Sequence, residues 1–231
     1  APSSYHGVTT AVIGNCGVGF APCRSDEPSR DAMVRLMEGV EDIPHPVLTE
    51  GLPWTWETFP EYLDFLASRP YDMDIAAYVP HAPLRVYVMG QRGADREPAT
   101  PADIAEMCRL LGQALDQGAL GIATSRSLFH RSSDGRAIPT YEAAQTELLA
   151  FAQVLRAKGK GVFQIVEDLH LPDANLDAMR ELARASGRPL TFSIGTGNTG
   201  PYRYPFLLEQ LAAANAEGLV MKGQLIPRGI G

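Results

Sequence analysis

A cysteine between glycines is the residue whose type and position point most directly to chemistry. The β-branched run from Val8 to Ile13 ends in Asn15, Cys16 and Gly17. Glycines let a backbone or a ligand approach closely, and a cysteine thiolate is a good zinc ligand. Most free cysteines are instead small buried apolar residues, so position alone leaves both interpretations open.

Histidine and arginine side chains follow two later apolar runs in the same way. His81 comes just after Val79, and Arg126 and His130 follow the run 120–124. The carboxyl ends of parallel strands meet at one edge of a sheet, where functional groups gather. A guanidinium matches a carboxylate, so we predict that Arg126, with His130 and Arg131 nearby, binds a substrate carboxylate. His81 is predicted to hydrogen-bond the substrate or to support a metal site. Loop structure and solvated charge are the competing interpretations.

Acidic residues follow another run. Glu167 and Asp168 come directly after residues 162–166. Their carboxylate oxygens are able to coordinate a metal ion, although acidic residues after a strand often cap helices instead. Their position after a strand leaves both interpretations open.

Elements that position these residues are visible as apolar runs alternating with helical stretches. Strands are predicted over Val8–Ile13, Ile75–Val79, Leu120–Thr124, Val162–Val166, Leu190–Ile194 and Val220–Leu225. Helices are predicted over residues 101–117, which Thr100 caps, and over residues 141–158, 173–186 and 205–216. This alternation predicts βα units around a parallel sheet, which fit part of a (β/α)8 barrel or an open doubly wound sheet.

The long segment 25–69 is predicted to be an elaborate βα connection over the strand ends, because it is rich in proline, tryptophan and acidic residues. Trp54, Trp56 and Phe59 either line an apolar pocket for an acyl group or anchor this connection.

Composition excludes several classes of protein. The formal net charge of −7 argues against nucleic acid or anionic membrane as partners. There is no long apolar run or secretory signal, so we expect a cytoplasmic protein. The three cysteines form neither a disulfide framework nor a CxxC zinc ribbon, and no GxGxxG, P-loop or GxSxG motif occurs.

Several blocks of sequence resemble the N-acyl-D-amino-acid deacylase (D-aminoacylase) family of the amidohydrolase superfamily. They are APSSYHGVTTAVIGNCGVGFAP, LMEGVEDIP, LPWTWETFPEYLDFL, VPHAPLRVYVMG and GALGIATSRSLFHR. The resemblance implies an α/β fold, a partial TIM barrel covering about strands 2 to 7. Residues 1–231 are then part of one barrel domain. In the family, a His-x-His pair on strand 1 falls before Ala1, and the catalytic aspartate of strand 8 falls beyond Gly231.

The resemblance also implies a cofactor and a ligand. Cys16 matches the metal-binding cysteine at the end of barrel strand 2, and the cofactor is zinc or another divalent metal. Asn15, Glu167 and Asp168 are then predicted to surround this metal site. The family's metal-binding histidines on strands 5 and 6 fall near Val166 and Ile194, neither of which binds metal.

The implied activity is hydrolysis of an amide bond in a small molecule, an N-acylated amino acid. Two alternatives stay open: a divergent enzyme with a reduced single-metal site acting on another amide, cyclic amide or ester, and an inactive barrel with a binding or structural role. The oligomeric state is left open. The 231-residue chain alone, with two open sheet edges, is expected to be inactive and poorly soluble.

Overall fold

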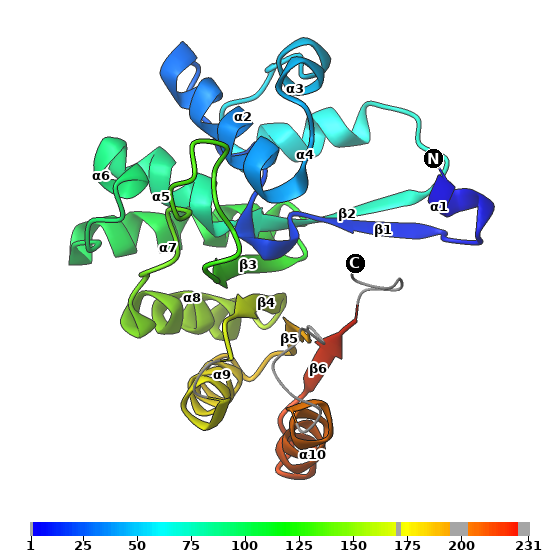
Figure 1. Ribbon diagram of the computed structural model, residues 1–231, viewed down its shortest axis with the longest axis vertical. Coiled ribbons are helices and arrows are strands. Elements are labelled where there is room, and N and C mark those ends of the chain that lie inside the picture. Colours follow the sequence, from blue (N-terminus) through cyan, green and yellow to red (C-terminus); the bar gives the residue numbers. More distant parts are fainter. Residues whose placement is uncertain (1, 170–171, 195–202, 226–231) are drawn as a thin grey trace.

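Six parallel strands form one sheet in the computed structural model, which describes residues 2–169, 172–194 and 203–225. The strands are β1 (Thr10–Ile13), β2 (Asp74–Pro80), β3 (Gly121–Arg126), β4 (Val162–Glu167), β5 (Leu190–Ser193) and β6 (Met221–Gln224). Their spatial order follows the chain without the reversal of a doubly wound sheet. The sheet curls into a half-barrel with its helices outside (Figure 1). The predicted partial barrel and all six predicted strands are confirmed.

Helices cover the outer face of the sheet. They include α5 (His81–Met89), α6 (Gln91–Ala94), α7 (Pro101–Asp116), α8 (Gln145–Lys158), α9 (Pro172–Ser186) and α10 (Arg203–Ala216). Thr100 caps α7 as predicted, in a reciprocal capping box with Asp103. The helix predicted from residue 141 begins at Gln145, because residues 139–142 form turns.

The connection between β1 and β2 is elaborate, as predicted. After a 3₁₀ turn, η1 (Asn15–Gly17), it contains α2 (Glu27–Glu41), α3 (His45–Gly51) and α4 (Phe59–Ala67). The tilted rings of Trp54 and Trp56 pack with their centroids 5.9 Å apart, and the Trp56 indole N–H donates to the Phe20 carbonyl at 2.9 Å. These contacts show both tryptophans anchoring the connection. A short helix, α1 (Pro2–Tyr5), precedes β1.

The main hydrophobic core lies between the sheet and the outer helices. Ile122, Phe163 and Phe192 are fully buried there, together with Met107 of α7 and Phe151 of α8. Successive side chains of a strand point to opposite faces, so the residues between these apolar ones face the concave side of the half-barrel. The outer face is therefore apolar, and the inner face carries the polar residues.

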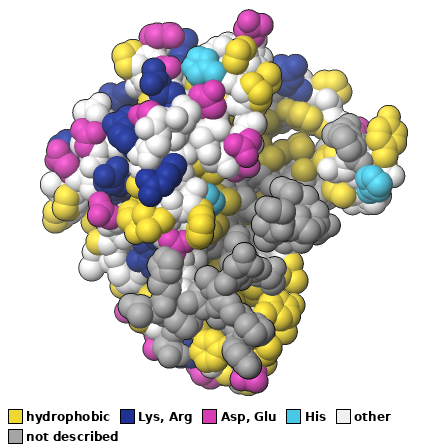
Figure 2. Space-filling model, in the orientation of Figure 1, with side chains coloured by type: hydrophobic (Ala, Val, Ile, Leu, Met, Phe, Trp, Pro, Cys, Tyr) yellow, Lys and Arg dark blue, Asp and Glu magenta, His cyan; other side chains and the backbone are white. Residues whose placement is uncertain are grey.

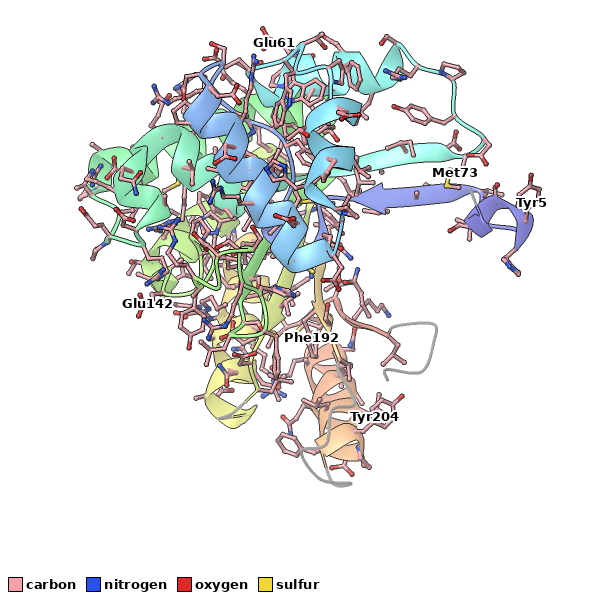
Figure 3. The ribbon with its side chains drawn as sticks, turned by 45° about the horizontal axis from the view of Figure 1, so that its top comes forward. Tyr5, Glu61, Met73, Glu142, Phe192 and Tyr204 are labelled. Carbon is pink, nitrogen blue, oxygen red and sulfur yellow. The ribbon has the colours of Figure 1, made fainter. Side chains whose placement is uncertain are left out.

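Both edge strands lack a second neighbour within the described residues, since β1 pairs only with β2 and β6 only with β5. Figure 3 shows β1 and β2 extending beyond the helices, with Tyr5 and Met73 at their far end. Val12 is 44% exposed on β1, and Leu225 beside β6 is 54% exposed. The half-barrel therefore has two open edges.

Candidate active site

The loop that carries Cys16 folds against the strand ends. Turn η1 contacts β2, β3 and β4, and the Cys16 backbone N–H donates to Gln164 Oε1 at 3.0 Å. Gly17 has a φ of +70°, and a Cβ there would lie 2.7 Å from the Ala123 carbonyl oxygen. No other residue type combines that backbone angle with so close an approach. The glycines around Cys16 therefore let the turn pack onto the sheet.

Cys16 has an unusual backbone conformation and an unusually high thiol pKa. Its backbone adopts a left-handed conformation with a φ of 61°. Burial, with a smaller contribution from the charge of Glu41, raises the pKa of the thiol to about 12. The thiol is thus neutral near pH 7 in the chain alone, and a bound cation is the kind of neighbour that stabilises the thiolate.

Several buried polar atoms lie on the concave side of the sheet, the side against which the Cys16 turn packs. Among the described residues, four buried atoms on this side of the sheet have no hydrogen-bond partner: Asn15 Oδ1, Gln164 Nε2, Thr191 Oγ1 and Gln224 Oε1. Asn15 was expected near Cys16. The sequence analysis missed Gln164, Thr191 and Gln224. The alternation of apolar and polar residues in VFQIVE and LTFS is the signal that could have predicted the first two on the inner face.

Arg126 and Glu167 are brought together on the helix-facing side. The Arg126 Nε donates to Glu167 Oε2 at 2.9 Å and its Nη1 donates to Gln145 Oε1 at 3.2 Å. Asn175 Nδ2 donates to the other Glu167 oxygen at 3.1 Å. Burial raises the pKa of Glu167, and the neighbouring Arg126 opposes that rise. Substrate binding by Arg126 and a metal-supporting role for Glu167 stay predictions. In this structure the two side chains form an ion pair with each other.

His81 is fully buried between β3 and α8. Its Nδ1 lies 2.8 Å from Thr124 Oγ1, and its Nε2 lies 2.6 Å from Glu147 Oε1, which also accepts from Arg85 Nη1 at 2.7 Å. Burial lowers the pKa of His81, although Glu147 opposes that shift. A substrate contact by His81 stays a prediction, and the contacts present join a strand end to a helix.

His130 and Asp168 lie at the carboxyl ends of β3 and β4. His130 Nδ1 is 2.7 Å from Ser125 Oγ, and burial lowers the pKa of His130 while Asp168 opposes the shift. Asp168 accepts from the Ser127 hydroxyl at 2.6 Å and from the Leu128 backbone N–H at 2.7 Å. Asp168 thus orders the loop after β3, and a role for either residue toward metal or substrate stays a prediction.

Metal-ligating side chains are sparse. No group of three His, Cys, Asp or Glu residues able to hold a metal ion occurs in the part of the chain that the structure describes. Val166 shares the inner face with Gln164, two residues earlier on β4. Ile194 instead is buried in the outer core, and a Cβ on Gly223 would meet its Cδ1 at 2.3 Å. The inner-face residue nearest the end of β5 is therefore Ser193. Cys16 fits one ligand position, and the described residues offer no complete ligand set around it.

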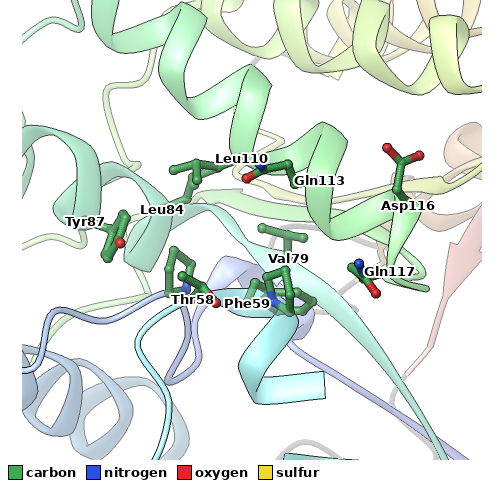
Figure 4. A pocket seen from close by; sticks show the side chains of 11 residues that line it. Thr58, Phe59, Val79, Leu84, Tyr87, Leu110, Gln113, Asp116 and Gln117 are labelled. Atoms are coloured by element: carbon green, nitrogen blue, oxygen red, sulfur yellow. The ribbon is translucent and has the colours of Figure 1, made fainter. Parts of the chain in front are cut away.

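Two of the cavities beside β2 are lined by Phe59, one of the residues predicted to form an acyl pocket. One, of about 320 Å³, lies on the helix-facing side between α4, α5 and α7 and is lined by Phe59, Leu84 and Gln113 among others (Figure 4). The second, of about 200 Å³, lies beside the Cys16 loop and is lined mostly by apolar residues that include Phe20, Met37 and Phe59. Phe59 lines both cavities, whereas Trp54 and Trp56 line neither.

The outer surface carries charges of both signs. In the view of Figure 2, basic side chains over the region of α2, α5 and α6 are interspersed with acidic ones. None of the helices in the described segments combines the length and apolar composition that crossing a bilayer requires.

The sheet is a singly wound parallel half-barrel, and the Cys16 turn packs on its concave side. The model of the Amidohydrolase family matches residues 1–222, so the chain belongs to this family.

Several curated proteins are similar to this chain. The chain is 35% identical over 123 residues to a D-aminoacylase of Alcaligenes xylosoxydans xylosoxydans, covering 53% of this chain and 22% of that protein. It is 32% identical over 165 residues to an N-acyl-D-aspartate deacylase of the same organism, covering 70% and 28%. An uncharacterized protein of Mycobacterium tuberculosis is 29% identical over 179 residues, covering 74% and 28%.

Solved structures extend the likeness to almost the whole chain. A D-aminoacylase studied for the functional role of its binuclear metal center superimposes with a TM-score of 0.72 and 26% identity, covering 98% of this chain and 43% of that one. A second crystal structure of D-aminoacylase gives a TM-score of 0.71 with the same identity and coverage. The chain thus spans less than half of the solved D-aminoacylase and about a quarter of the curated relatives.

Proposed function

We propose that the full-length protein hydrolyses the amide bond of a small N-acylated amino acid. The observation that carries this proposal is the placement of Cys16 at the inner carboxyl edge of a half-barrel that superimposes on D-aminoacylase over 98% of its length. Two deacylases of N-acyl-D-amino acids among the relatives favour substrates of that type.

Cys16 would hold a divalent metal in the full-length protein, together with ligands outside the described residues. When bound, such a metal polarises an amide carbonyl and lowers the pKa of a bound water. This chain's own contribution is to present the thiol. Gln164 fixes the Cys16 backbone by accepting its N–H, and Gly17 lets the turn approach the Ala123 carbonyl.

Hydrolysis of N-acetylleucine enantiomers by the full-length protein tests this proposal, with release of free leucine as the measured quantity. We expect turnover of at least one enantiomer and a loss of roughly 100-fold or more in kcat/KM in Cys16→Ala, because a ligand that positions the reactive centre is removed. Cys108→Ala, which removes a half-buried thiol on α7, is the matched control and should retain wild-type activity. Equal activity in Cys16→Ala and wild type would contradict the proposed role.

A second candidate is a reduced site acting on a cyclic amide or an ester. It is favoured by Val166 and Ser193, the inner-face residues at the ends of β4 and β5, because neither side chain is a usual metal ligand. Turnover of cyclic amides or esters, lost in Cys16→Ala, without turnover of N-acetylleucine would select this candidate. A protein that binds no metal and turns over none of these substrates would be an inactive barrel.

A further inference from the structure

One row of inner-face residues crosses β4, β5 and β6 beside the Cys16 loop. Gln164 is in register with Thr191, and Thr191 is in register with Lys222. Their chain neighbours Phe163, Leu190 and Met221 are buried in the core under the helices. By the alternation of strand side chains, the three residues of the row therefore share the concave face.

The first two members of the row have unused hydrogen-bonding capacity. Gln164 is fully buried, and its Oε1 accepts the Cys16 N–H, which places the amide Nε2 on the opposite side. Within the described residues, Gln164 Nε2 and Thr191 Oγ1 are buried and have no partner. A buried polar group without a partner costs roughly 1–3 kcal/mol, so an unpaired amide and hydroxyl side by side indicate a polar occupant.

The third member of the row supplies a positive charge. Lys222 is exposed on the open side of the half-barrel, and no ion pair joins it to another described residue. Strand neighbours are about 4.8 Å apart. The long side chains of Gln164 and Lys222 flank the short one of Thr191, so all three are able to reach one small group above Thr191.

We propose that Gln164, Thr191 and Lys222 bind the carboxylate of the substrate, an assignment that rests on the proposed function. An amide N–H, a hydroxyl and an ammonium are all donors, and a carboxylate is the acceptor-only group of matching charge. Arg126, the residue predicted from the sequence for this task, faces the helices and is paired with Glu167 at 2.9 Å. Gln164, the first member of the row, accepts the Cys16 backbone N–H at 3.0 Å, so the row begins beside the Cys16 turn.

Two substrates that differ only in this group test the proposal: the N-acetylleucine enantiomer that the full-length protein prefers, and its neutral carboxamide. We expect wild type to favour the acid, and Lys222→Met to lower the ratio of the two kcat/KM values at least about tenfold. Thr191→Val should lower kcat/KM for the acid without lowering the melting temperature, because the hydroxyl it removes is buried and unpaired in this chain.

Lys160→Met is the matched control, because it removes an exposed lysine whose nearest ion-pair partner is Asp116 at 3.8 Å. The ratio should not change in this variant. If Lys222→Met lowers the melting temperature and slows both substrates equally, Lys222 pairs with a carboxylate of the protein itself and the proposal is overturned.

Failure of the proposed function is distinguishable from failure of this inference. If wild type turns over neither substrate, calorimetric titration with the N-acetylleucine enantiomers decides. Binding that Lys222→Met weakens would support the carboxylate site in a protein without amidase activity, and the absence of binding to wild type would overturn it.

Discussion

Cys16 is held from two sides, by a hydrogen bond and by a close backbone approach. The Gln164 amide accepts its N–H, and the adjacent Gly17 packs onto the backbone of Ala123 and Thr124. Both contacts are made by the turn rather than by the thiol. The position of the sulfur therefore depends on residues that carry no metal-binding chemistry.

Gly17→Ala is expected to destabilise the full-length protein by about 2–4 kcal/mol. The new Cβ combines a left-handed φ with a contact at 2.7 Å to the Ala123 carbonyl oxygen and another at 2.7 Å to the Thr124 Cα. Urea denaturation measures the change. Gly7→Ala is the matched control, because its φ of +81° is also left-handed but nothing lies within 4 Å of the added Cβ. It should cost only about 1–2 kcal/mol. Equal losses in the two variants would show that the Gly17 contact has no effect.

Residue identity drew attention to Cys16, whose metal-binding role stays a prediction, but it did not give the directions in which the neighbouring side chains point. Glycines and a β-branched run indicated a strand that ends in a turn, which the structure confirms. Arg126 has the right chemistry for a carboxylate, but its place in the alternation of β3 turns it toward α8 and Glu167. Neighbouring residues of a strand point to opposite faces of the sheet, and the charge of a residue does not reveal which face it occupies.

Helix α8 is joined to the sheet by a buried cluster of polar and charged side chains. Glu147 on α8 contacts His81 and Arg85 of α5, and His81 contacts Thr124 of β3. All four side chains are buried. Burial lowers the pKa of His81, so a neutral imidazole between a hydroxyl and a carboxylate is the favoured state.

Glu147→Leu is expected to lower the free energy of unfolding by about 3–5 kcal/mol, because it leaves Arg85 buried without its carboxylate. Thermal or urea unfolding of the full-length protein measures the loss. Glu142→Leu is the comparison, since the Glu142 side chain is 63% exposed in its ion pair with Arg96. That variant should change stability by less than about 1 kcal/mol. A small effect of Glu147→Leu would contradict the structural role assigned to the cluster.

The strand and helix periodicity of the sequence was sufficient to predict the order of the elements. The cap at Thr100 and the apolar faces of the helices could be predicted from the sequence, because local interactions determine them. Gln164 and Thr191 were missed because their importance depends on register between strands, which brings residues 27 positions apart side by side. Such pairing is set by the packed sheet rather than by either strand alone.

At the scale of the whole molecule, the described residues form an open half-barrel. Unpaired edges present free backbone groups, and Val12 and Leu225 add exposed apolar side chains at β1 and beside β6. Such edges promote association with other chains.

Expressed alone, the 231-residue chain is expected to aggregate or form large assemblies, as its sequence also predicted. Size-exclusion chromatography with light scattering provides the measurement, and the full-length protein is the comparison. A monodisperse monomer of the short chain that unfolds cooperatively would show that the open edges are tolerated.

The most direct test of the account is the metal content per chain of the full-length protein after exhaustive dialysis, in wild type, Cys16→Ala and Cys108→Ala. We predict that wild type and Cys108→Ala retain a divalent metal and that Cys16→Ala loses at least part of it. A wild-type protein without bound metal, or a metal content unaffected by Cys16→Ala, would contradict the assignment of Cys16 as a ligand.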